Sequence, residues 1–530
     1  MRIRFFSSTL GSAFLAAVLL APAAAAGQET APRANLPRTA DGKPDFSGIW
    51  QVRNTAASDL LTHAARLHMP PGHAVVPDND IPYQPWAAAK RSENFRNRAT
   101  ADPLAQCFMP GVPRIMYLDF PFQIFQTPQL IAMTFEWSSV HRQIYTDGSS
   151  HVDGIDFWMG DSRGRWEGDT LVVNVSNHND KTWFDMAGNF HSEALKLVER
   201  YTLVDADTIQ YEVTVEDPKV FTRPWTISMP FHRHKEMDRV LEYQCQAEVE
   251  EANGAFPRQP ATWYPEPGAP ASPVAGGSAA GFNPQQTARP RPAVNSAAIR
   301  RRPDGKPDLQ GTYVSDGGGA NFGLEPRERS ALSPAGRGLV VDPPDGKLPT
   351  QAWAKAEHES RARPERGYDD PTAHCFVAGV PRSMYVPQPY YIMQTDTHVV
   401  LLFERMSYRV VPTDGRGHLP DRIRLWQGDS VGRWDGDTLV VETTNLNGKT
   451  WLNEAGEIVS HAETVVERFT PVDADTLHYE ATVTDPIVYT RPWTISFPIK
   501  RQTFELLEVA CHEDDQDLPR LKAIKDAAVY

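Results

Sequence analysis

The sequence predicts a mainly β protein composed of two tandem antiparallel β-barrel domains, each with a short helical segment before the barrel. Two observations support this fold class. One long segment recurs almost unchanged in the second half of the chain. Within each half, short runs of alternating apolar and polar residues are separated by turn residues. Alternation with period two is typical of half-buried strands, and short turns join antiparallel neighbours.

The internal repeat is clearest between residues 160–183 and 428–451. GDSRGRWEGDTLVVNVSNHNDKTW corresponds to GDSVGRWDGDTLVVETTNLNGKTW, with 17 of the 24 positions identical. The match continues in register, because DGKPDFSGIW from residue 41 corresponds to DGKPDLQGTY from residue 304, and TRPWTIS occurs in both halves. Agreement of this extent indicates a tandem duplication.

The second half of each repeat has the patterns of strands. In the first repeat these are expected at 169–173, 198–203, 208–215, 225–229 and 240–243. Asp205-Ala206-Asp207 separates two of these runs, as a tight hairpin turn does. Helices are expected at 84–98 and, in the second repeat, at 351–361. Successive strands joined by short turns predict an antiparallel meander closed into a barrel.

The first 26 residues have the pattern of a secretory signal peptide. Arg2 and Arg4 precede an apolar run at 13–20, and Ala24-Ala25-Ala26 provides the small residues of a cleavage site. We therefore expect the mature protein to begin near Gly27 and to be periplasmic or secreted. The apolar run is too short to span a bilayer, and no later segment is long and uncharged enough to do so.

The charge of the chain argues against nucleic acid as a partner. The formal net charge is −14, and removal of the two signal arginines takes it to −16. Nucleic-acid binding depends mainly on Lys and Arg side chains that neutralise phosphates, and the chain has no basic run. The expected partner is a small molecule, and the oligomeric state stays open.

A stretch rich in Pro, Ala, Gly and Ser at 251–299 separates the repeats. Such a composition buries too little apolar surface to offset the entropy of ordering, so a flexible linker is expected. The first barrel domain is then predicted at 37–250 and the second at 300–518.

The four cysteines occur two per repeat at matching positions, as Cys107, Cys245, Cys375 and Cys511. Four cysteines allow three pairings, and the duplication favours pairing within each repeat. Each disulfide is expected to join the segment before the barrel to its last strand. A metal site is not predicted, because no C-x-x-C spacing is present.

Two resemblances follow from these motifs. DGKPDFSGIW, together with GRWEGDTLVV and the following KTW, resembles a large family of secreted bacterial proteins without an assigned function. This resemblance covers nearly all of both repeats and implies localisation and domain boundaries, but no activity. Gly48-Ile49-Trp50, followed by an up-and-down meander, resembles lipocalin-like barrels and concerns architecture alone.

Candidate site residues lie between the helix and the repeated strands. Glu136, Arg142, Asp147 and His151 correspond to Glu404, Arg409, Asp414 and His418 in the second repeat. Glu136 and Arg142 can lie on one strand face, and His151 can act as an acid or base that Asp147 orients. The alternative interpretation is that Asp147 forms a hairpin turn, His151 is a solvated loop residue and Arg142 is a structural cation.

Further residues extend this candidate site. Glu199 precedes Arg200 on a strand, so one of the two charges faces inward and needs a partner, for which Arg142 or Glu136 is available. The remaining candidate ligand contacts are Tyr145, Trp158 and His191. No metal or cofactor signature is present. Ser162 satisfies G-x-S-x-G, but the helix of a nucleophile elbow does not follow it, so a turn residue is expected.

Two classes of function are consistent with this sequence. The first is a periplasmic or secreted protein that binds a small apolar or aromatic molecule, which the absence of catalytic signatures favours. The alternative is a cofactor-independent lyase, isomerase or hydrolase that uses His151 and Asp147 in the first barrel. The first repeat is favoured as the active one because it carries His151, His178 and His191 together.

Overall fold

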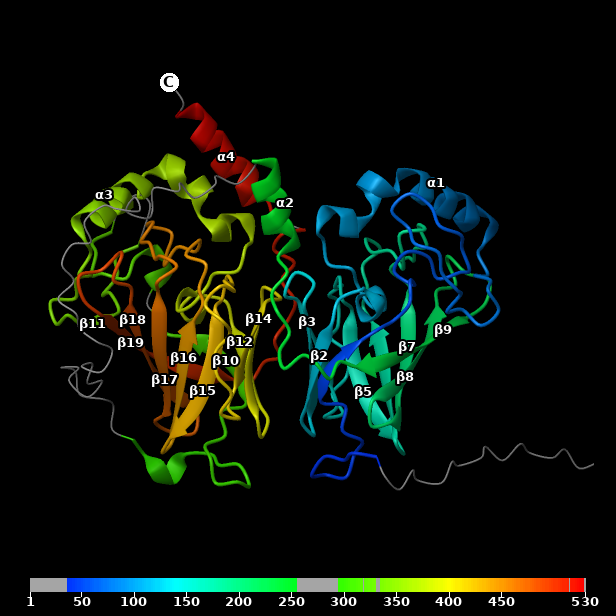
Figure 1. Cartoon of the computed structure of the whole chain (residues 1–530), viewed down its shortest axis with the longest axis horizontal. Coiled ribbons are helices and arrows are strands. Elements are labelled where there is room, and N and C mark those ends of the chain that lie inside the picture. The colour runs from blue at the N-terminus through cyan, green and yellow to red at the C-terminus, as the bar shows by residue number, and fades with distance from the viewer. Residues whose placement is uncertain (1–35, 255–293, 318, 330–333, 514, 529–530) are drawn as a thin grey trace, which may run out of the picture.

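The computed structural model describes residues 36–254, 294–317, 319–329, 334–513 and 515–528. It confirms a mainly β fold with two barrel-like sheets that lie side by side, the first repeat on the right of Figure 1 and the second on the left. Helices gather at one end of both sheets (Figure 1). The predicted signal peptide and most of the predicted linker lie outside the described residues.

The first repeat forms a closed barrel of nine strands in sequence order. Pairing of Trp50 with Arg233 closes the barrel between its first and last strands. The strands are β1 (Gly48–Gln51), β2 (Phe122–Gln126), β3 (Leu130–Phe135), β4 (His141–Tyr145), β5 (Asp161–Glu167), β6 (Thr170–Ser176), β7 (Lys196–Asp205), β8 (Thr208–Glu216) and β9 (Trp225–Arg233).

One pair of strands departs from the expected antiparallel meander. Strands β4 and β5 are parallel, with Ile144 opposite Ser162. The intervening chain, residues 146–160, returns along the barrel before β5 begins, which a tight hairpin cannot do. The expectation of a purely antiparallel barrel was therefore wrong at this position.

The second repeat repeats this arrangement as a nearly closed sheet. Its path runs β14-β13-β12-β10-β19-β18-β17-β16-β15, and β11 pairs with β19. The strands are β10 (Gly311–Ser315), β11 (Val340–Asp342), β12 (Tyr390–Gln394), β13 (His398–Phe403), β14 (Tyr408–Pro412), β15 (Asp429–Asp435), β16 (Thr438–Thr444), β17 (Thr464–Pro471), β18 (Thr476–Thr484) and β19 (Trp493–Gln502).

The alternating sequence pattern explains the packing of these strands. Along β8, buried residues alternate with more exposed ones, and Tyr211, Val213 and Val215 face inward with 0% exposure. The hairpin between β7 and β8 turns at Asp205–Thr208, as the sequence predicts. Each barrel therefore encloses its own apolar core, to which Trp50 contributes in the first repeat and Tyr313 in the second.

The helices are partly as expected. The structure confirms α1 (Pro85–Ala101) and α3 (Ala352–Arg361), and adds α2 (Cys245–Asn253) and α4 (Asp517–Ala527). The strand expected at 240–243 is absent from the described chain, where Tyr243 forms only an isolated bridge with Trp137. Among the described residues, no helix has the length and apolar character needed to cross a membrane.

The two repeats pack directly against each other. A shared apolar cluster joins β2 and β3 to β12, β13 and β14. It contains Phe125, Leu130, Ala132, Met393, Val400, Leu402, Tyr408 and Leu506. The His141 side chain lies 3.0 Å from the Phe403 carbonyl, and the Tyr408 hydroxyl donates to the Phe135 carbonyl at 3.0 Å. The barrels are therefore docked through equivalent surfaces.

After its last strand, each repeat sends a segment across to the other. The Glu242 carboxylate accepts hydrogen bonds from the backbone N–H groups of Trp426 at 2.6 Å and Gln427 at 3.1 Å. In the same way, Glu508 accepts from Trp158 at 2.7 Å and Met159 at 2.9 Å. Residues 234–244 and 502–510 are called the crossing segments below.

Both expected disulfides are present, Cys107 with Cys245 and Cys375 with Cys511. Their placement differs from the expectation, because neither second cysteine is on the last strand. Cys245 begins α2, and Cys511 lies between β19 and α4. Each disulfide therefore anchors the chain where the crossing segment ends.

Candidate functional site

An ion pair fills the interior of the first barrel. Glu199 faces inward from β7, and its carboxylate pairs with the Arg142 guanidinium from β4. Tyr201 and Tyr211 donate to the same carboxylate at 2.9 Å and 2.8 Å. Ser162 accepts from Arg142 Nε at 3.1 Å. The pairing of Glu199 with Arg142 is one of those expected from the strand pattern, and both side chains are buried inside the barrel.

The second barrel holds the same pair with one exchange of neighbours. Arg409 donates to Glu467 at 2.9 Å and to Ser430 at 2.8 Å. Tyr201 is replaced by Phe469, which has no hydroxyl, and Val175 is replaced by Thr443. The Thr443 hydroxyl accepts from Arg409 Nη2 at 2.7 Å, so a hydroxyl is lost at one position and gained at another.

Electrostatics stabilise these buried charges. Burial lowers the pKa of Arg142, whereas the negative charge of Glu199 raises it. The net result is a pKa above the ordinary value. Burial likewise lowers the pKa of Arg409, but the charge of Glu467 raises it, and the net result is a raised pKa. Because both charges are paired and hydrogen-bonded within the barrel, Arg142, Glu199 and Arg409 have the contacts of a structural network.

The structure does not bring His151, Asp147 and Glu136 together. His151 Nδ1 lies 3.2 Å from an oxygen of Asp161, while Asp147 accepts hydrogen bonds from Ser149. Glu136 is partly buried between β3 and β4, and burial raises its pKa. The space next to Asp161 and Arg163 has a volume of about 60 Å³.

The second repeat arranges its counterparts in the same way. His418 Nδ1 lies 3.0 Å from Asp429, and Asp414 pairs with Arg416. Asp429 and its counterpart Asp161 in the first repeat also take part in ion-pair networks that join the two repeats. Asp429 pairs with Arg239 of the first crossing segment at 2.5 Å, and Arg163 bridges Asp161 and Glu505 of the second.

The other predicted contacts are dispersed. Tyr145 lies beneath Arg163, 4.7 Å from the guanidinium carbon to the ring centre. Trp158 packs edge-on against Phe108, whereas His191 is buried beside Thr182 at 2.7 Å. Ser162 is within β5, so the expected turn was wrong. Among the described residues, no three potential metal ligands form a cluster.

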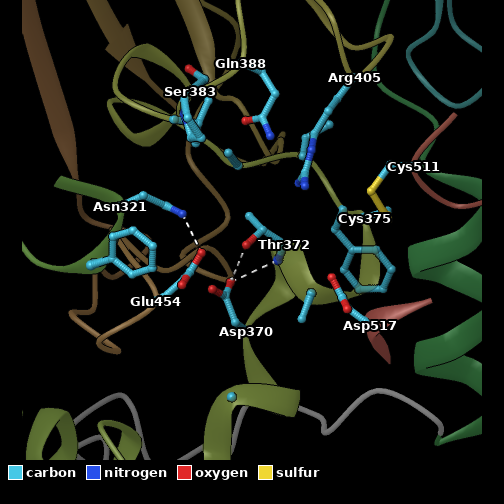
Figure 2. A pocket seen from close by; sticks show the side chains of 18 of the residues that line it. Asn321, Asp370, Thr372, Cys375, Ser383, Gln388, Arg405, Glu454, Cys511 and Asp517 are labelled. Atoms are coloured by element: carbon cyan, nitrogen blue, oxygen red, sulfur yellow. Dashed lines mark hydrogen bonds between the residues drawn. A yellow bond between two sulfur atoms is a disulfide. The ribbon is translucent and has the colours of Figure 1, made fainter. Parts of the chain in front are cut away.

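A much larger cavity lies elsewhere, at the helical end of the second barrel. Its volume is about 1250 Å³. Its walls come from the β13–β14 hairpin, residues 383–389, and the chain between α3 and Cys375. Further walls come from Asn321, Glu454 and the first turns of α4. We call this space the second-repeat cavity (Figure 2).

Three aromatic side chains of the first repeat occupy positions equivalent to residues at or near this cavity. Phe120, Trp137 and Tyr243 pack on one another, with ring centres 5.1 to 5.4 Å apart. Their counterparts in the second repeat are Gln388, Arg405 and Val509. Gln388 and Arg405 line the second-repeat cavity, so polar side chains stand there in place of two aromatic rings.

Polar residues of the cavity belong to two groups. Asp370 lines the cavity and forms a buried bidentate pair with Arg382 at 2.7 and 2.8 Å, which Asp102 and Arg114 repeat in the first barrel. This pair is common to both repeats and is therefore structural. The second group is specific to the second repeat: Ser383, Gln388, Arg405 and Glu454 replace Ile115, Phe120, Trp137 and Met186.

The second group faces the cavity. Figure 2 shows Gln388 and Arg405 pointing from one wall toward Thr372, with Glu454 on the opposite side. Glu454 accepts a hydrogen bond from Asn321 at 2.6 Å, and burial raises its pKa. The Ser383 hydroxyl is buried with no hydrogen-bond partner in the described part of the chain.

Sequence reasoning missed this cavity. Its walls come from segments that are far apart in the chain, and none of them carries a recognisable motif. One feature of the sequence could have identified it, namely the replacement of aromatic residues by polar ones between otherwise similar repeats. Arg405 in place of Trp137 is the clearest example.

The described part of the chain is therefore a two-barrel protein with a partly open cavity at the end of the second barrel. No family model matches the chain, and no curated protein matches it. One similar solved structure is a protein of unknown function from the DUF3598 family of Nostoc punctiforme PCC 73102. It has 8% sequence identity and a TM-score of 0.14, covering 72% of this chain and 88% of its own. A likeness at this level carries no argument about either fold or function.

Proposed function

We propose that this protein is an extracytoplasmic small-molecule-binding protein whose ligand occupies the second-repeat cavity. The observation that carries this proposal is the contrast between the repeats. The first repeat has the packed aromatic residues Phe120, Trp137 and Tyr243. In the second repeat the counterparts of the first two, Gln388 and Arg405, line a cavity of about 1250 Å³. Ligand pockets typically measure about 300–1000 Å³, so this cavity is large enough for a drug-sized molecule.

The lining of the cavity supports a ligand with an apolar or aromatic body. Phe322, Phe376 and Tyr385 contribute aromatic surface, and Leu521 adds an aliphatic side chain from α4. A few polar groups among apolar walls are the usual composition of a small-molecule site. The interiors of the barrels are packed with side chains, so the proposed site is at a barrel end.

The two disulfides are compatible with an oxidising compartment outside the cytoplasm, where such bonds persist. The predicted signal peptide and the resemblance to secreted proteins point to the same location. In this proposal the first repeat supports the second, because the crossing segments join the two barrels through equivalent contacts.

Acid–base catalysis in the first barrel has weaker support. A substrate would have to reach His151, but the neighbouring space of about 60 Å³ accommodates only a few water molecules. His151 also contacts Asp161, whose neighbour Arg163 holds the second crossing segment. Ligand binding is therefore better supported than catalysis as the function of this protein.

Transfer of the first repeat's aromatic residues into the second tests the proposal. The variant Gln388→Phe with Arg405→Trp is expected to close the second-repeat cavity. The uncharged fluorescent probe N-phenyl-1-naphthylamine should bind the wild-type chain and lose at least about tenfold in affinity in this variant. Arg165→Gln, a change on the exposed face of β5, is the control for nonspecific dye binding.

Native mass spectrometry of the mature protein from its source provides an independent measurement. A retained small molecule in the wild type that is absent from the closed variant would support the proposal. Unchanged probe affinity and an unchanged retained ligand in a folded closed variant would refute it.

A further inference from the structure

We propose that the ligand of the second-repeat cavity is an organic anion with an apolar body, and that Arg405 binds its anionic group. This inference rests on the proposed function, because it names the ligand class of the same cavity. It depends on the charge balance of the cavity wall and on the polar groups that surround Arg405.

Four arginines line the cavity, and two of them are already engaged. Arg520 lies 3.2 Å from Asp517. Arg327 donates to three backbone carbonyl groups of its own loop, those of Gly319, Gly323 and Pro334. Arg363 and Arg405 are the cavity-lining arginines without a hydrogen bond or ion pair to any described residue.

Of these two, Arg405 is placed to meet a ligand. It lies on the hairpin between β13 and β14, and its side chain points into the cavity in Figure 2. Desolvation and the positive charge of Arg382 lower the pKa of Arg405, and the carboxylates of Asp370, Asp515 and Glu454 raise it in part. The Arg405 side chain is exposed and has no hydrogen bond or ion pair to a described residue, so its guanidinium is available to an anionic group.

The neighbouring groups complete a site for a carboxylate or sulfonate. Arginine presents a planar fork of N–H donors that matches such groups in bidentate geometry. Gln388 points toward the same space and can donate from its amide. The Ser383 hydroxyl, 5% exposed and without a partner in the described chain, offers another donor next to Arg382.

The apolar surface then selects for the rest of the ligand. Phe322, Phe376 and Tyr385 provide aromatic surface in the cavity wall. The equivalent of Arg405 in the first repeat is Trp137, so the cation appears only where the space is open. An inorganic anion would satisfy Arg405 but leave the apolar walls in contact with water, which disfavours it as the ligand.

A matched pair of fluorescent probes tests the inference in the full mature chain. 8-Anilinonaphthalene-1-sulfonate and N-phenyl-1-naphthylamine share the same aromatic body, and only the first carries an anionic group. The wild type should bind the sulfonate more tightly. Arg405→Gln should weaken the sulfonate by about 10- to 100-fold and the neutral probe by less than about threefold.

Arg405→Lys separates charge from geometry. It keeps the positive charge but loses the planar fork, so its affinity for the sulfonate should fall between wild type and Arg405→Gln. The far-ultraviolet circular dichroism spectrum checks that each variant is folded. Equal weakening of both probes in Arg405→Gln, or no weakening of the sulfonate, would overturn the anion inference.

The two proposals fail in different ways. If the closed variant Gln388→Phe with Arg405→Trp binds both probes as wild type does, the cavity is not the binding site and the proposed function fails. If that variant loses the neutral probe while Arg405→Gln leaves the sulfonate affinity unchanged, only the anion inference fails.

Discussion

Glu242 and Glu508 occupy equivalent positions in the two repeats, and each accepts two backbone hydrogen bonds from the opposite repeat. The relationship extends to His141 and Tyr408, which contact the carbonyl groups of Phe403 and Phe135. Such reciprocity is the property of an isologous interface, in which the same surface is used on both sides. Here both sides belong to one chain.

The first prediction concerns the charge of Glu242. Burial raises the pKa of this carboxyl to about 7, above the ordinary value of 4.5. Between these pH values the folded protein retains a proton that the unfolded chain releases, so the contribution of Glu242 to stability is lost as pH rises from 4.5 through 7. Glu242→Gln removes this titration while retaining an oxygen that accepts both N–H groups.

The measurement is urea-induced unfolding at pH 5 and pH 8. Relative to wild type, Glu242→Gln should gain about 1–2 kcal/mol between these pH values, less than the full linkage value because the side chain is only partly buried. Glu248→Gln, on the exposed side of α2, serves as a control and should show no such gain. An equal pH dependence of wild type and Glu242→Gln would contradict the assignment.

The second prediction uses the exchange of hydroxyl groups between the barrels. Tyr201→Phe removes one partner of Arg142 and one of Glu199, and should lower the free energy of unfolding by about 1–3 kcal/mol. Adding Val175→Thr recreates the arrangement that Phe469 and Thr443 have in the second repeat. The double variant should therefore recover part of the loss.

A double-mutant cycle measures this coupling by chemical denaturation. The expected coupling between Val175→Thr and Tyr201→Phe is favourable and about 1 kcal/mol. Strict additivity of the two changes would show that the hydroxyl groups do not substitute for each other. The reverse pair, Phe469→Tyr with Thr443→Val, provides the matched test in the second barrel.

The third prediction concerns the buried pair itself. Arg142→Met leaves the Glu199 carboxylate without its cation and should destabilise the protein by about 3–5 kcal/mol. Adding Glu199→Gln removes the uncompensated charge and should restore a substantial part of that loss. The midpoint temperatures of thermal unfolding of both variants test this prediction. A double variant less stable than Arg142→Met would exclude burial of an unpaired charge as the cause of the lost stability.

The sequence allowed prediction of features that depend on repeats and local patterns. The alternation of the strand predicted that either Glu199 or Arg200 faces inward, with Arg142 or Glu136 as a partner, and the structure places Glu199 inward against Arg142. Residues 240–243 illustrate the limit. Their apolar pattern predicted a strand, but the segment crosses to the other barrel and has no ladder partner beyond the bridge of Tyr243.

The candidate site was harder to predict because it depends on contacts between distant segments. Arg405, Asn321 and Glu454 meet only after the second barrel has folded, and no spacing along the chain reveals their proximity. His151 and Asp147 are close in sequence, yet His151 contacts Asp161 and Asp147 contacts Ser149. Sequence proximity therefore identified residue types without identifying their partners.

The last prediction distinguishes the two disulfides. Their cysteines are separated by 138 and 136 residues, so in a chain-entropy model both should contribute nearly the same stability. Removal of either pair, as Cys107→Ala with Cys245→Ala or Cys375→Ala with Cys511→Ala, should cost about 2–5 kcal/mol in urea-induced unfolding.

Binding should separate the two variants. Cys375 and Cys511 line the second-repeat cavity and tether the chain that leads into α4, so their removal should loosen one wall. The affinity for N-phenyl-1-naphthylamine should therefore fall by at least about threefold in this variant. It should fall by less when Cys107 and Cys245 are replaced, because Cys245 does not line the cavity and only its neighbour Gln244 does. Equal effects of both variants on probe affinity would show that the loss follows from global destabilisation. In that case the wall that Cys511 anchors would not determine binding.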